Sequence, residues 1–327
     1  MATSLPFQRA LVTGGAGFIG SHLCERLLAA GVSVEALDDL STGSVLNIEH
    51  LRGNPLFRFT VGDVRRIADL AEAVDRADAV FHMAAAVGVR LIVERPVHTI
   101  ETNLEGTTNV LECATKKRKL VLVASTSEVY GKSDKLPFHE ESDLVLGASR
   151  RPRWAYACSK LMDEFLALAH HRESGLPVVV ARLFNTVGPR QTGRYGMVIP
   201  RFVAQALAGE PLTVYGDGSQ TRTFCHVADT VEGLVALLAH PKAAGGVFNV
   251  GGLEELSIAD LAARVIAGTG SASRIEFIPF EEAYDGDFED MARRRPDLSK
   301  IAALIGYAPK RTLDDIIADV AAQHRTA

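Results

Sequence analysis

The chain has 327 residues, of which 47% are hydrophobic and 23% are charged, a composition typical of a globular protein with a large buried core. Its formal net charge of −5 excludes a general positive field, so we expect no nucleic-acid partner. No apolar run is long enough to cross a membrane and no apolar leader precedes the first predicted strand, so we expect a cytoplasmic protein without a membrane partner.

The cysteines and histidines indicate neither a disulfide framework nor a metal centre. The four cysteines are far apart and form no Cys-x-x-Cys pair, and the ten histidines show no metal-ligand spacing. Each cysteine lies in an apolar stretch typical of a helix or a strand. We therefore expect buried thiols in a reducing compartment and no bound metal.

Apolar segments of strand length alternate with helical patterns over the first half of the chain. The strands are expected at residues 9–13, 33–37, 57–61, 79–83, 120–124 and 178–183, and the helices at 19–30, 67–76, 97–117 and 156–173. This alternation predicts an α/β fold with a doubly wound parallel sheet of the Rossmann type. The strands are apolar throughout, as expected when helices cover both faces of a sheet.

A glycine-rich turn lies between the first predicted strand and the first predicted helix. Its cofactor-binding residues are Gly14, Gly17, Phe18, Ile19 and Gly20. Gly14 permits the tight turn, Gly17 removes a side chain that would block phosphates, and Gly20 lets the helix pack close to the strand. This arrangement predicts a dinucleotide site at the helix N-terminus, although an ordinary glycine turn of another α/β protein is the alternative.

The second predicted strand ends in an acid, Asp38. A carboxylate at this position accepts hydrogen bonds from the ribose hydroxyls of a dinucleotide and repels a 2′-phosphate. The sequence therefore predicts NAD, rather than NADP, as the cofactor.

Tyr156 and Lys160 are four residues apart in a predicted helix and so share one of its faces. An ammonium near a phenol favours the phenolate and lowers its pKa. Tyr156 is then able to remove a proton from a sugar hydroxyl while a hydride leaves the same carbon for NAD. Thr126 follows a central strand and is placed to hydrogen-bond the same oxygen. The alternatives are a solvated helix face for the pair and a satisfied turn for the hydroxyl.

The pattern changes after residue 183, where the chain becomes rich in glycine, proline and arginine. A helix at 227–239 and a strand at 246–250 are expected to return to the main sheet. We therefore predict an NAD-binding domain made of residues 1–183 with a return segment at about 227–250. Residues 184–226 and 251–327 are expected to form a smaller, discontinuous substrate-binding lobe over the carboxyl ends of the strands.

Seven motifs together resemble the extended short-chain dehydrogenase/reductases that act as nucleotide-sugar epimerases, dehydratases and decarboxylases. The resemblance covers nearly the whole chain, and the combination is highly specific. The motifs are TGGAGFIG at 13–20, GDV at 62–64, HMAA at 82–85, STSEVYG at 125–131, YACSK at 156–160, FNTVGPR at 184–190 and GDGSQTR at 216–222.

The resemblance implies a role for further residues and a UDP-sugar substrate. Asp63 and Val64 would border the adenine, and Ala84 and Ala85 would line the path of the cofactor, which Tyr156 and Lys160 would also contact. Asn185 would contact the substrate. Arg222 would pair with the substrate diphosphate, for which a guanidinium is a good bidentate partner, although a surface salt bridge is the alternative. A homodimer through the helices at 97–117 and 156–173 is also implied.

Three features resemble UDP-glucuronate decarboxylases in particular: Thr126-Ser127-Glu128, Pro152-Arg153-Trp154 and the arginine motif RRRPD at 293–297. A 4-keto uronate is a β-keto acid, so carbon dioxide leaves once the ketone has formed. Ser127 would belong to the catalytic group, and Arg153 would bind the substrate. Glu128 and Arg294 would handle proton delivery and charge at C5.

The segment AVGVR at 86–90 resembles instead the 4-epimerases, which act on UDP-glucose/UDP-galactose or UDP-glucuronate/UDP-galacturonate pairs. Arg90 would hold a substrate carboxylate or cap a nearby helix. A dehydratase fits less well, because position 127 is Ser where those enzymes often carry Asp. A simple alcohol dehydrogenase and a non-catalytic NAD-binding protein are further alternatives.

Overall fold

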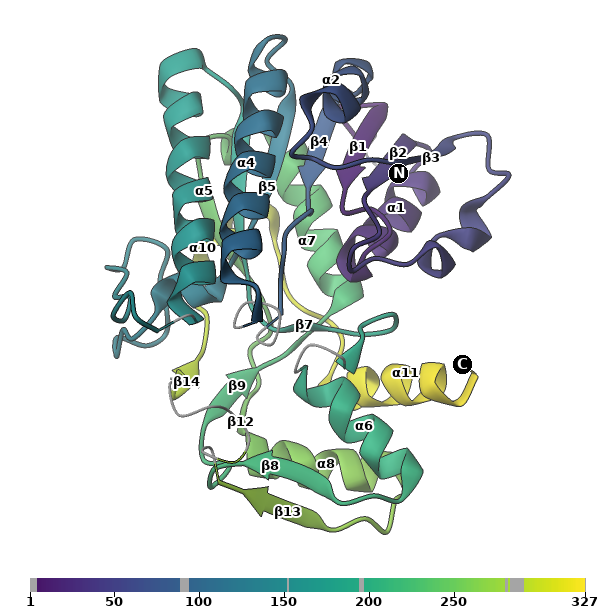
Figure 1. Cartoon of the computed structure of the whole chain (residues 1–327), viewed down its shortest axis with the longest axis vertical. Helices are drawn as coiled ribbons and strands as arrows, with labels where there is room; N and C mark the ends of the chain where they lie inside the picture. Colours follow the sequence, from purple (N-terminus) through teal and green to yellow (C-terminus); the bar gives the residue numbers. More distant parts are fainter. Residues whose placement is uncertain are drawn as a thin grey trace.

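A seven-stranded parallel sheet forms the centre of the computed structural model, which describes residues 5–88, 94–151, 153–193, 197–279, 282 and 291–326 (Figure 1). The strand order is β11-β6-β5-β4-β1-β2-β3, and every neighbouring pair is parallel. The strands are β1 (Arg9–Thr13), β2 (Ser33–Asp38), β3 (Phe57–Val61), β4 (Ala79–His82), β5 (Leu120–Thr126), β6 (Val178–Leu183) and β11 (Val247–Val250). This confirms the predicted doubly wound fold of the Rossmann type.

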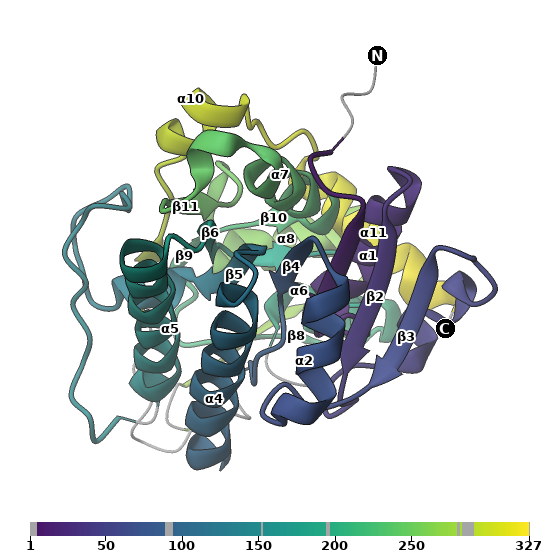
Figure 2. The same ribbon diagram turned by 90° about the horizontal axis from the view of Figure 1, so that it is seen from above.

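Helices cover both faces of this sheet. The helices α2 (Ile67–Arg76), α4 (Pro96–Thr115) and α5 (Arg153–Ser174) lie on one side, and α1 (Phe18–Ala29) and α7 (Val227–Ala239) pack on the other (Figure 2). Successive residues of a strand point to opposite faces of the sheet. Leu11 therefore packs in the core on the side of α2, α4 and α5, and Val12 packs in the core on the side of α1 and α7. Both faces are therefore buried, which explains why the strands are apolar throughout.

A second lobe lies beyond the carboxyl ends of the strands (Figure 1). Its core is formed by α6 (Val198–Ala208), α8 (Ile258–Thr269) and α11 (Leu313–Thr326). Short strands complete it, namely β7 (Thr186–Val187), β8 (Leu212–Tyr215), β9 (Thr221–Thr223), β10 (Cys225–His226), β12 (Glu255–Ser257), β13 (Ile275–Ile278) and β14 (Arg293–Arg294). Three of these strands form one small sheet in the order β12-β9-β14, although they are far apart in the sequence.

One element departs from the predicted division of the chain. The helix α10 (Ser299–Ile305) lies within the range expected for the second lobe, but Leu298 and Ile301 pack into the core of the main sheet. The side-chain amide of Asn249 in β11 donates to the backbone oxygens of Phe138 and Asp297 and so holds this segment beside β11. The return segment and α10 thus pack on the same edge of the sheet.

A buried ion pair fastens α5 to the sheet. Arg182 in β6 donates from Nη2 to Oε2 of Glu164 in α5 at 2.8 Å, and their side chains are 5% and 3% exposed. The Arg182 guanidinium also lies 4.9 Å from the centre of the Tyr130 ring. The hydroxyl of Tyr130 donates to Asn249 Oδ1 at 2.7 Å. These contacts connect β6, α5 and β11.

We expect the substitution Glu164→Gln to lower the free energy of unfolding by about 3 kcal/mol, because it leaves the Arg182 charge buried without its counter-charge. Urea denaturation measures this change. Glu49→Gln serves as the control, because Glu49 and its partner Arg52 have side chains that are 57% and 67% exposed. The control should change stability by about 0.5 kcal/mol or less. Equal effects of the two substitutions would contradict the structural role of the buried pair.

Candidate active site

A cavity of about 740 Å³ lies at the carboxyl ends of the central strands and extends to the second lobe. The glycine turn after β1 and the ends of β2, β5 and β6 line one part of it. Residues of α6, β8 and β9 line another part. This is the place where doubly wound folds bind their ligands.

The glycine turn has the geometry that a dinucleotide site requires. Gly14 has a φ of +68°, and a Cβ at this residue would lie 2.8 Å from the backbone nitrogen of Ala84. A Cβ on Gly20 would overlap the carbonyl oxygen of Gly14. Gly17 precedes α1 as its N-cap, and Gly17, Phe18 and Ile19 line the cavity. The start of α1 therefore faces the cavity, where its backbone amides suit a diphosphate.

Asp38 lies at the end of β2 and is held in a fixed orientation. Its Oδ2 accepts from the backbone nitrogen of Ala16 at 2.9 Å, and its Oδ1 accepts from that of Leu40 at 2.8 Å. Burial raises the pKa of this carboxyl, and the two backbone hydrogen bonds oppose that rise. The side chain lines the cavity beside the turn, where the sequence predicted an acid for the adenosine ribose.

The other residues predicted around the cofactor are divided between the cavity and its surroundings. Val64, Ala84 and Ala85 line the cavity. The lining does not include Asp63, whose Oδ2 accepts from Nη2 of Arg65 at 2.6 Å. This hydrogen bond lowers the pKa of Asp63. The structure thus pairs the Asp63 carboxylate with Arg65, and its place beside the adenine stays a prediction.

Tyr156, Lys160 and Thr126 all line the cavity. Tyr156 and Lys160 lie on α5, and both are buried. Thr126 ends β5, where its hydroxyl accepts from the backbone nitrogen of Glu128 at 3.2 Å and hydrogen-bonds the phenol of Tyr156. The end of β5 and the first turns of α5 therefore converge on one phenolic oxygen.

The pKa of Tyr156 is shifted in the direction opposite to the one expected from the sequence. Burial and the charges of Glu128 and Asp163 raise the pKa of Tyr156 above its ordinary value, whereas Thr126 and Arg294 lower it. The expected net lowering of the Tyr156 pKa is therefore wrong for this structure, in which the Lys160 ammonium donates to Asp163 Oδ2 at 2.7 Å. The carboxylate of Asp163 balances the charge that was expected to act on Tyr156.

Glu128 brings together residues from three remote parts of the chain. Its Oε1 lies 3.8 Å from Nη2 of Arg153, at the start of α5, and 3.5 Å from Nη2 of Arg294 in β14. All three side chains line the cavity and are nearly buried. Ser127, in contrast, is 1% exposed and lies outside the lining. The catalytic role of Ser127 therefore stays a prediction.

The predicted substrate residues of the second lobe also reach the cavity. Asn185 donates to the backbone oxygen of Thr223 at 2.8 Å, and Arg222 donates from Nη1 to that of Thr221 at 2.8 Å. Both residues line the cavity, and Arg222 lies beside Arg294 in the register of β9 and β14. Arg90 lies outside the described residues.

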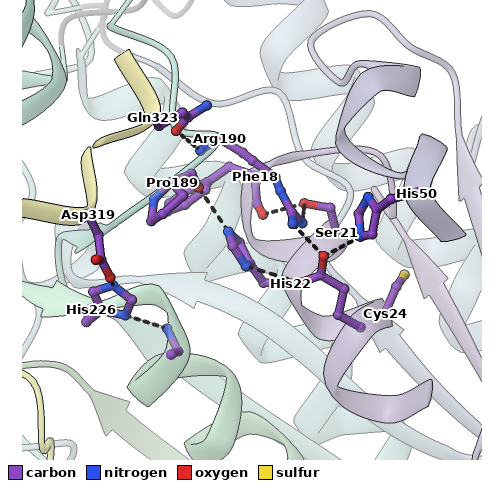
Figure 3. A network of polar contacts seen from close by, with 12 residues as sticks. Phe18, Ser21, His22, Cys24, His50, Pro189, Arg190, His226, Asp319 and Gln323 are labelled. Carbon is purple, nitrogen blue, oxygen red and sulfur yellow. Dashed lines mark hydrogen bonds and ion pairs between the residues drawn. The ribbon is translucent and has the colours of Figure 1, made fainter. Parts of the chain in front are cut away.

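Two residues of the site were missed in the sequence. Asp163 lies one helical turn after Lys160, and an acid three residues from a lysine in a predicted helix was a signal for this pairing. Arg190 ends the motif FNTVGPR but was given no role. It lines the cavity and joins α1 to the second lobe (Figure 3). No sequence signal predicts its contacts, because its partners lie far away in the chain.

The contacts of Arg190 form a network around α1 (Figure 3). Its Nη1 donates to Ser21 Oγ at 3.2 Å, its Nη2 pairs with Glu25, and its backbone nitrogen donates to Gln323 of α11. Burial opposes ionisation of Glu25, but hydrogen bonds from His22 and Arg190 outweigh it and lower the pKa of Glu25 to about 2. The network fastens the last helix to the helix that begins at the glycine turn.

The described part of the chain offers neither a metal site nor a membrane span. Within it, no three His, Cys, Asp or Glu side chains are grouped so that they could hold a metal ion. None of the helices described has the length and apolar character needed to span a bilayer. All four cysteines are free, and three are buried, whereas Cys158 is exposed, contrary to the expectation that every thiol is buried.

Comparison with known proteins shows which family and which enzymes this chain resembles. The model of the "NAD dependent epimerase/dehydratase family" matches residues 10–251. The chain is 42% identical over 304 residues to the UDP-N-acetyl-alpha-D-glucosaminuronate decarboxylase of Bacillus cytotoxicus, covering 92% of this chain and 93% of that protein. It is 38% identical over 308 residues to UDP-glucuronic acid decarboxylase 1 of Danio rerio, covering 94% of this chain and 70% of that protein.

A solved structure is similar along almost its whole length. The UDP-glucuronic acid 4-epimerase of Bacillus cereus, in complex with UDP-glucuronic acid and NAD, superposes with a TM-score of 0.87. It is 31% identical, and the match covers 97% of this chain and 99% of that one.

We expect Asp38→Asn to weaken NAD binding about tenfold, because the ribose hydroxyls lose a charged acceptor. The preference for NAD over NADP should also narrow, because the acid no longer repels a 2′-phosphate. Calorimetric titration with each dinucleotide measures both effects.

The control for this prediction is Asp39→Asn. Asp39 follows directly, is exposed, and accepts from the backbone nitrogen of Ser41. We expect this change to leave NAD affinity within about threefold of the parent, which is well under 1 kcal/mol. If only the Asp39 variant lost affinity, the assignment of the ribose to Asp38 would be wrong.

Proposed function

The chain belongs to the NAD-dependent epimerase/dehydratase family, and we propose that it decarboxylates a UDP-linked glucuronic acid to the corresponding UDP-linked five-carbon sugar. Its cofactor is NAD. The proposed substrate class comprises UDP-glucuronate and its 2-acetamido counterpart, the substrates named for the two similar decarboxylases. The reaction involves no net oxidation, because the hydride taken from the sugar returns to it.

The observation that supports this proposal is the meeting of Glu128, Arg153 and Arg294 beside Tyr156 in one cavity. A uronate substrate carries a negative carboxylate, which guanidinium groups bind well. Loss of that carboxylate then requires a proton at C5. We assign the delivery of that proton to Glu128, whose carboxylate lies in the same cavity within ion-pair distance of both guanidinium groups.

Each residue has a defined task in the proposed reaction. Tyr156 removes the proton of the C4 hydroxyl and later returns it, while Thr126 hydrogen-bonds the same oxygen. NAD, when bound, would supply the acceptor for the C4 hydride and the donor that returns it after carbon dioxide has left. In the 4-keto uronate the C5–C6 bond breaks, and its electron pair forms an enolate whose charge resides on the C4 oxygen. Protonation at C5 through Glu128 then restores the ketone.

The nucleotide is assigned to the part of the cavity near the second lobe. We assign the diphosphate to Arg222, because a buried guanidinium at the cavity wall is a good bidentate partner for phosphate oxygens. Asn185 is assigned to the sugar side, on the strength of its place between β6 and β7.

Epimerisation at C4 is the second candidate function. It is favoured by the similarity to the UDP-glucuronic acid 4-epimerase of Bacillus cereus and by the segment AVGVR. In this reaction the 4-keto sugar turns before the hydride returns, so the carboxylate is retained. The two candidates share the first oxidation and differ in the fate of the 4-keto sugar.

A homodimer in the cytoplasm belongs to the same proposal. The helices α4 and α5 lie side by side on one face of the molecule (Figure 1). Their outward faces carry apolar side chains, with Val97 65%, Met162 48% and Phe165 57% exposed. A second copy that packs against these helices would remove this apolar surface from water.

We expect the protein to release carbon dioxide from UDP-glucuronate or from its 2-acetamido counterpart, with no accumulation of NADH. Mass spectrometry of the products distinguishes the five-carbon product from an epimer of unchanged mass. An epimer without release of carbon dioxide would show that decarboxylation is wrong and that 4-epimerisation takes its place. Growing absorbance of NADH would indicate a simple dehydrogenase instead.

Glu128→Gln should reduce release of carbon dioxide about a hundredfold or more, because the relayed proton is lost. The rate of carbon dioxide formation at saturating substrate measures this. The control is Glu141→Gln, whose parent side chain is 77% exposed and pairs with Lys300 at the surface. That variant should keep the parent rate, and a parent-like rate for Glu128→Gln would remove Glu128 from the mechanism.

We expect Tyr156→Phe to lower turnover by a factor of about a thousand, because the C4 hydroxyl loses its base. NAD affinity should stay near that of the parent protein, which calorimetric titration checks. Retention of most of the activity would show that another group removes the proton.

A further inference from the structure

Arg294 enters the cavity from β14, a strand of only two residues. Its Nη2 lies 3.5 Å from Glu128 Oε1, and its side chain is 11% exposed. β14 lies at one edge of the small sheet β12-β9-β14, beside β9. A strand this short forms few backbone hydrogen bonds, so side-chain contacts must help to fix its place.

The two faces of this small sheet carry different side chains. Register partners lie on the same face of a sheet, and neighbours along a strand lie on opposite faces. Arg222 of β9 and Arg294 of β14 are register partners, and both line the cavity. Leu256 of β12 is the other register partner of Arg222. Arg293 and Glu255, the neighbours of Arg294 and Leu256, therefore lie together on the face that points away from the cavity.

On that face, the side chain of Glu255 reaches across β9 to Arg293. Its Oε1 accepts from Arg293 Nε at 2.9 Å, and its Oε2 accepts from Arg293 Nη2 at 2.8 Å. Thr221, in the strand between them, donates its hydroxyl to Glu255 Oε1 at 2.5 Å. Hydrogen bonds from Arg293 and Thr221 lower the pKa of Glu255 to about 2, so this carboxylate is ionised at neutral pH. A two-pronged ion pair thus joins the two outer strands of the sheet.

This ion pair fixes a position and contributes little to global stability. The Arg293 side chain is 51% exposed, and ion pairs at such sites stabilise a fold weakly. Backbone hydrogen bonds attach the chain on both sides of Arg294, from Thr221 to the oxygen of Ala292 and from Phe138 to that of Arg295. The pair between Glu255 and Arg293 adds a side-chain contact at the residue directly before Arg294.

We propose that Glu255 is a positioning residue, whose carboxylate holds Arg293 and so sets where the Arg294 guanidinium stands in the cavity. The inference deepens the proposed function and rests on it in taking Arg294 as a group that binds the uronate carboxylate. A charge-assisted hydrogen bond depends on its geometry, and a displacement of about 1 Å is enough to weaken it strongly.

The consequence is specific to acidic sugars. Without its partner Glu255, Arg293 no longer anchors β14, and Arg294 loses its fixed approach to the carboxylate at C6 of the substrate. A neutral sugar has no such carboxylate and loses nothing. Arg222, assigned to the diphosphate, lies on the central strand β9 and keeps its place. Glu255 therefore determines the preference for a uronate over a neutral sugar.

The test compares two affinities by calorimetric titration of the protein loaded with NADH, in which C4 has no hydride acceptor and the sugar is not converted. UDP-glucuronate is compared with UDP-glucose, and each 2-acetamido counterpart is compared in the same way, because the members of each pair differ only at C6. We expect Glu255→Gln to lower the ratio of the two affinities about tenfold. The affinity for the neutral sugar should stay within about twofold of the parent value.

Two further variants separate positioning from general damage to the lobe. Glu254→Gln is the matched control, because Glu254 also pairs with an arginine, Arg264 of α8, at 2.7 Å. This variant should keep the parent ratio. Arg294→Met should lower the ratio on its own, and adding Glu255→Gln to it should lower the ratio no further, because Glu255 acts through Arg294.

A parent-like ratio in Glu255→Gln, or a further fall when it is added to Arg294→Met, would overturn the inference. Should Glu255→Gln fail to fold, Arg293→Gln removes the same ion pair from its exposed side and should lower the ratio by the same factor. The titration does not depend on turnover. A protein that shows the expected ratios but releases no carbon dioxide would refute the proposed reaction and leave the role of Glu255 intact. Release of carbon dioxide with a parent-like ratio in Glu255→Gln would do the reverse.

Discussion

The buried pair between Arg182 and Glu164 determines where the chemistry of this molecule takes place. Its guanidinium and carboxylate bond through several atoms, so the contact fixes the rotation of α5 about its axis and its distance from the sheet. Tyr156 and Lys160 lie on the same buried side of this helix as Glu164. A rotation of α5 would therefore move the phenol away from Thr126 and the end of β5. The fold positions its base through an ion pair that itself takes no part in the reaction.

The second lobe contributes to the site through very short elements. Arg294 reaches Glu128 from a two-residue strand, and this strand is held by its parallel pairing with β9, which carries Arg222. At the opposite end of the cavity, α11 is connected through Gln323 to Arg190, and Arg190 contacts α1. The lobe is thus attached at both the sugar end and the dinucleotide end. The two ligands of the proposed reaction would meet between these attachments.

The sequence predicted those features of the site that depend on residues close together in the chain. The glycine turn follows from the spacing of its glycines, Asp38 from the end of an apolar segment, and the shared helix face of Tyr156 and Lys160 from the period of 3.6 residues. Contacts over long separations left no such pattern, as for Arg190 with Glu25, which are 165 positions apart. The hydrogen bond between Asp63 and Arg65 was not predicted, because a family motif does not reveal this contact. The acidity of Tyr156 was misjudged because only one charge near it was considered.

The charges around Tyr156 determine how readily its phenol loses a proton. Burial favours a neutral phenol, and the carboxylates of Glu128 and Asp163 favour it further. The same Glu128 bridges the arginines that we assign to the substrate carboxylate. On the proposed mechanism, the protonated Tyr156 phenol returns its proton to the C4 oxygen as the hydride returns to C4. A proton and a hydride that leave the sugar and return to it together give a reaction without net oxidation, as the proposed function requires.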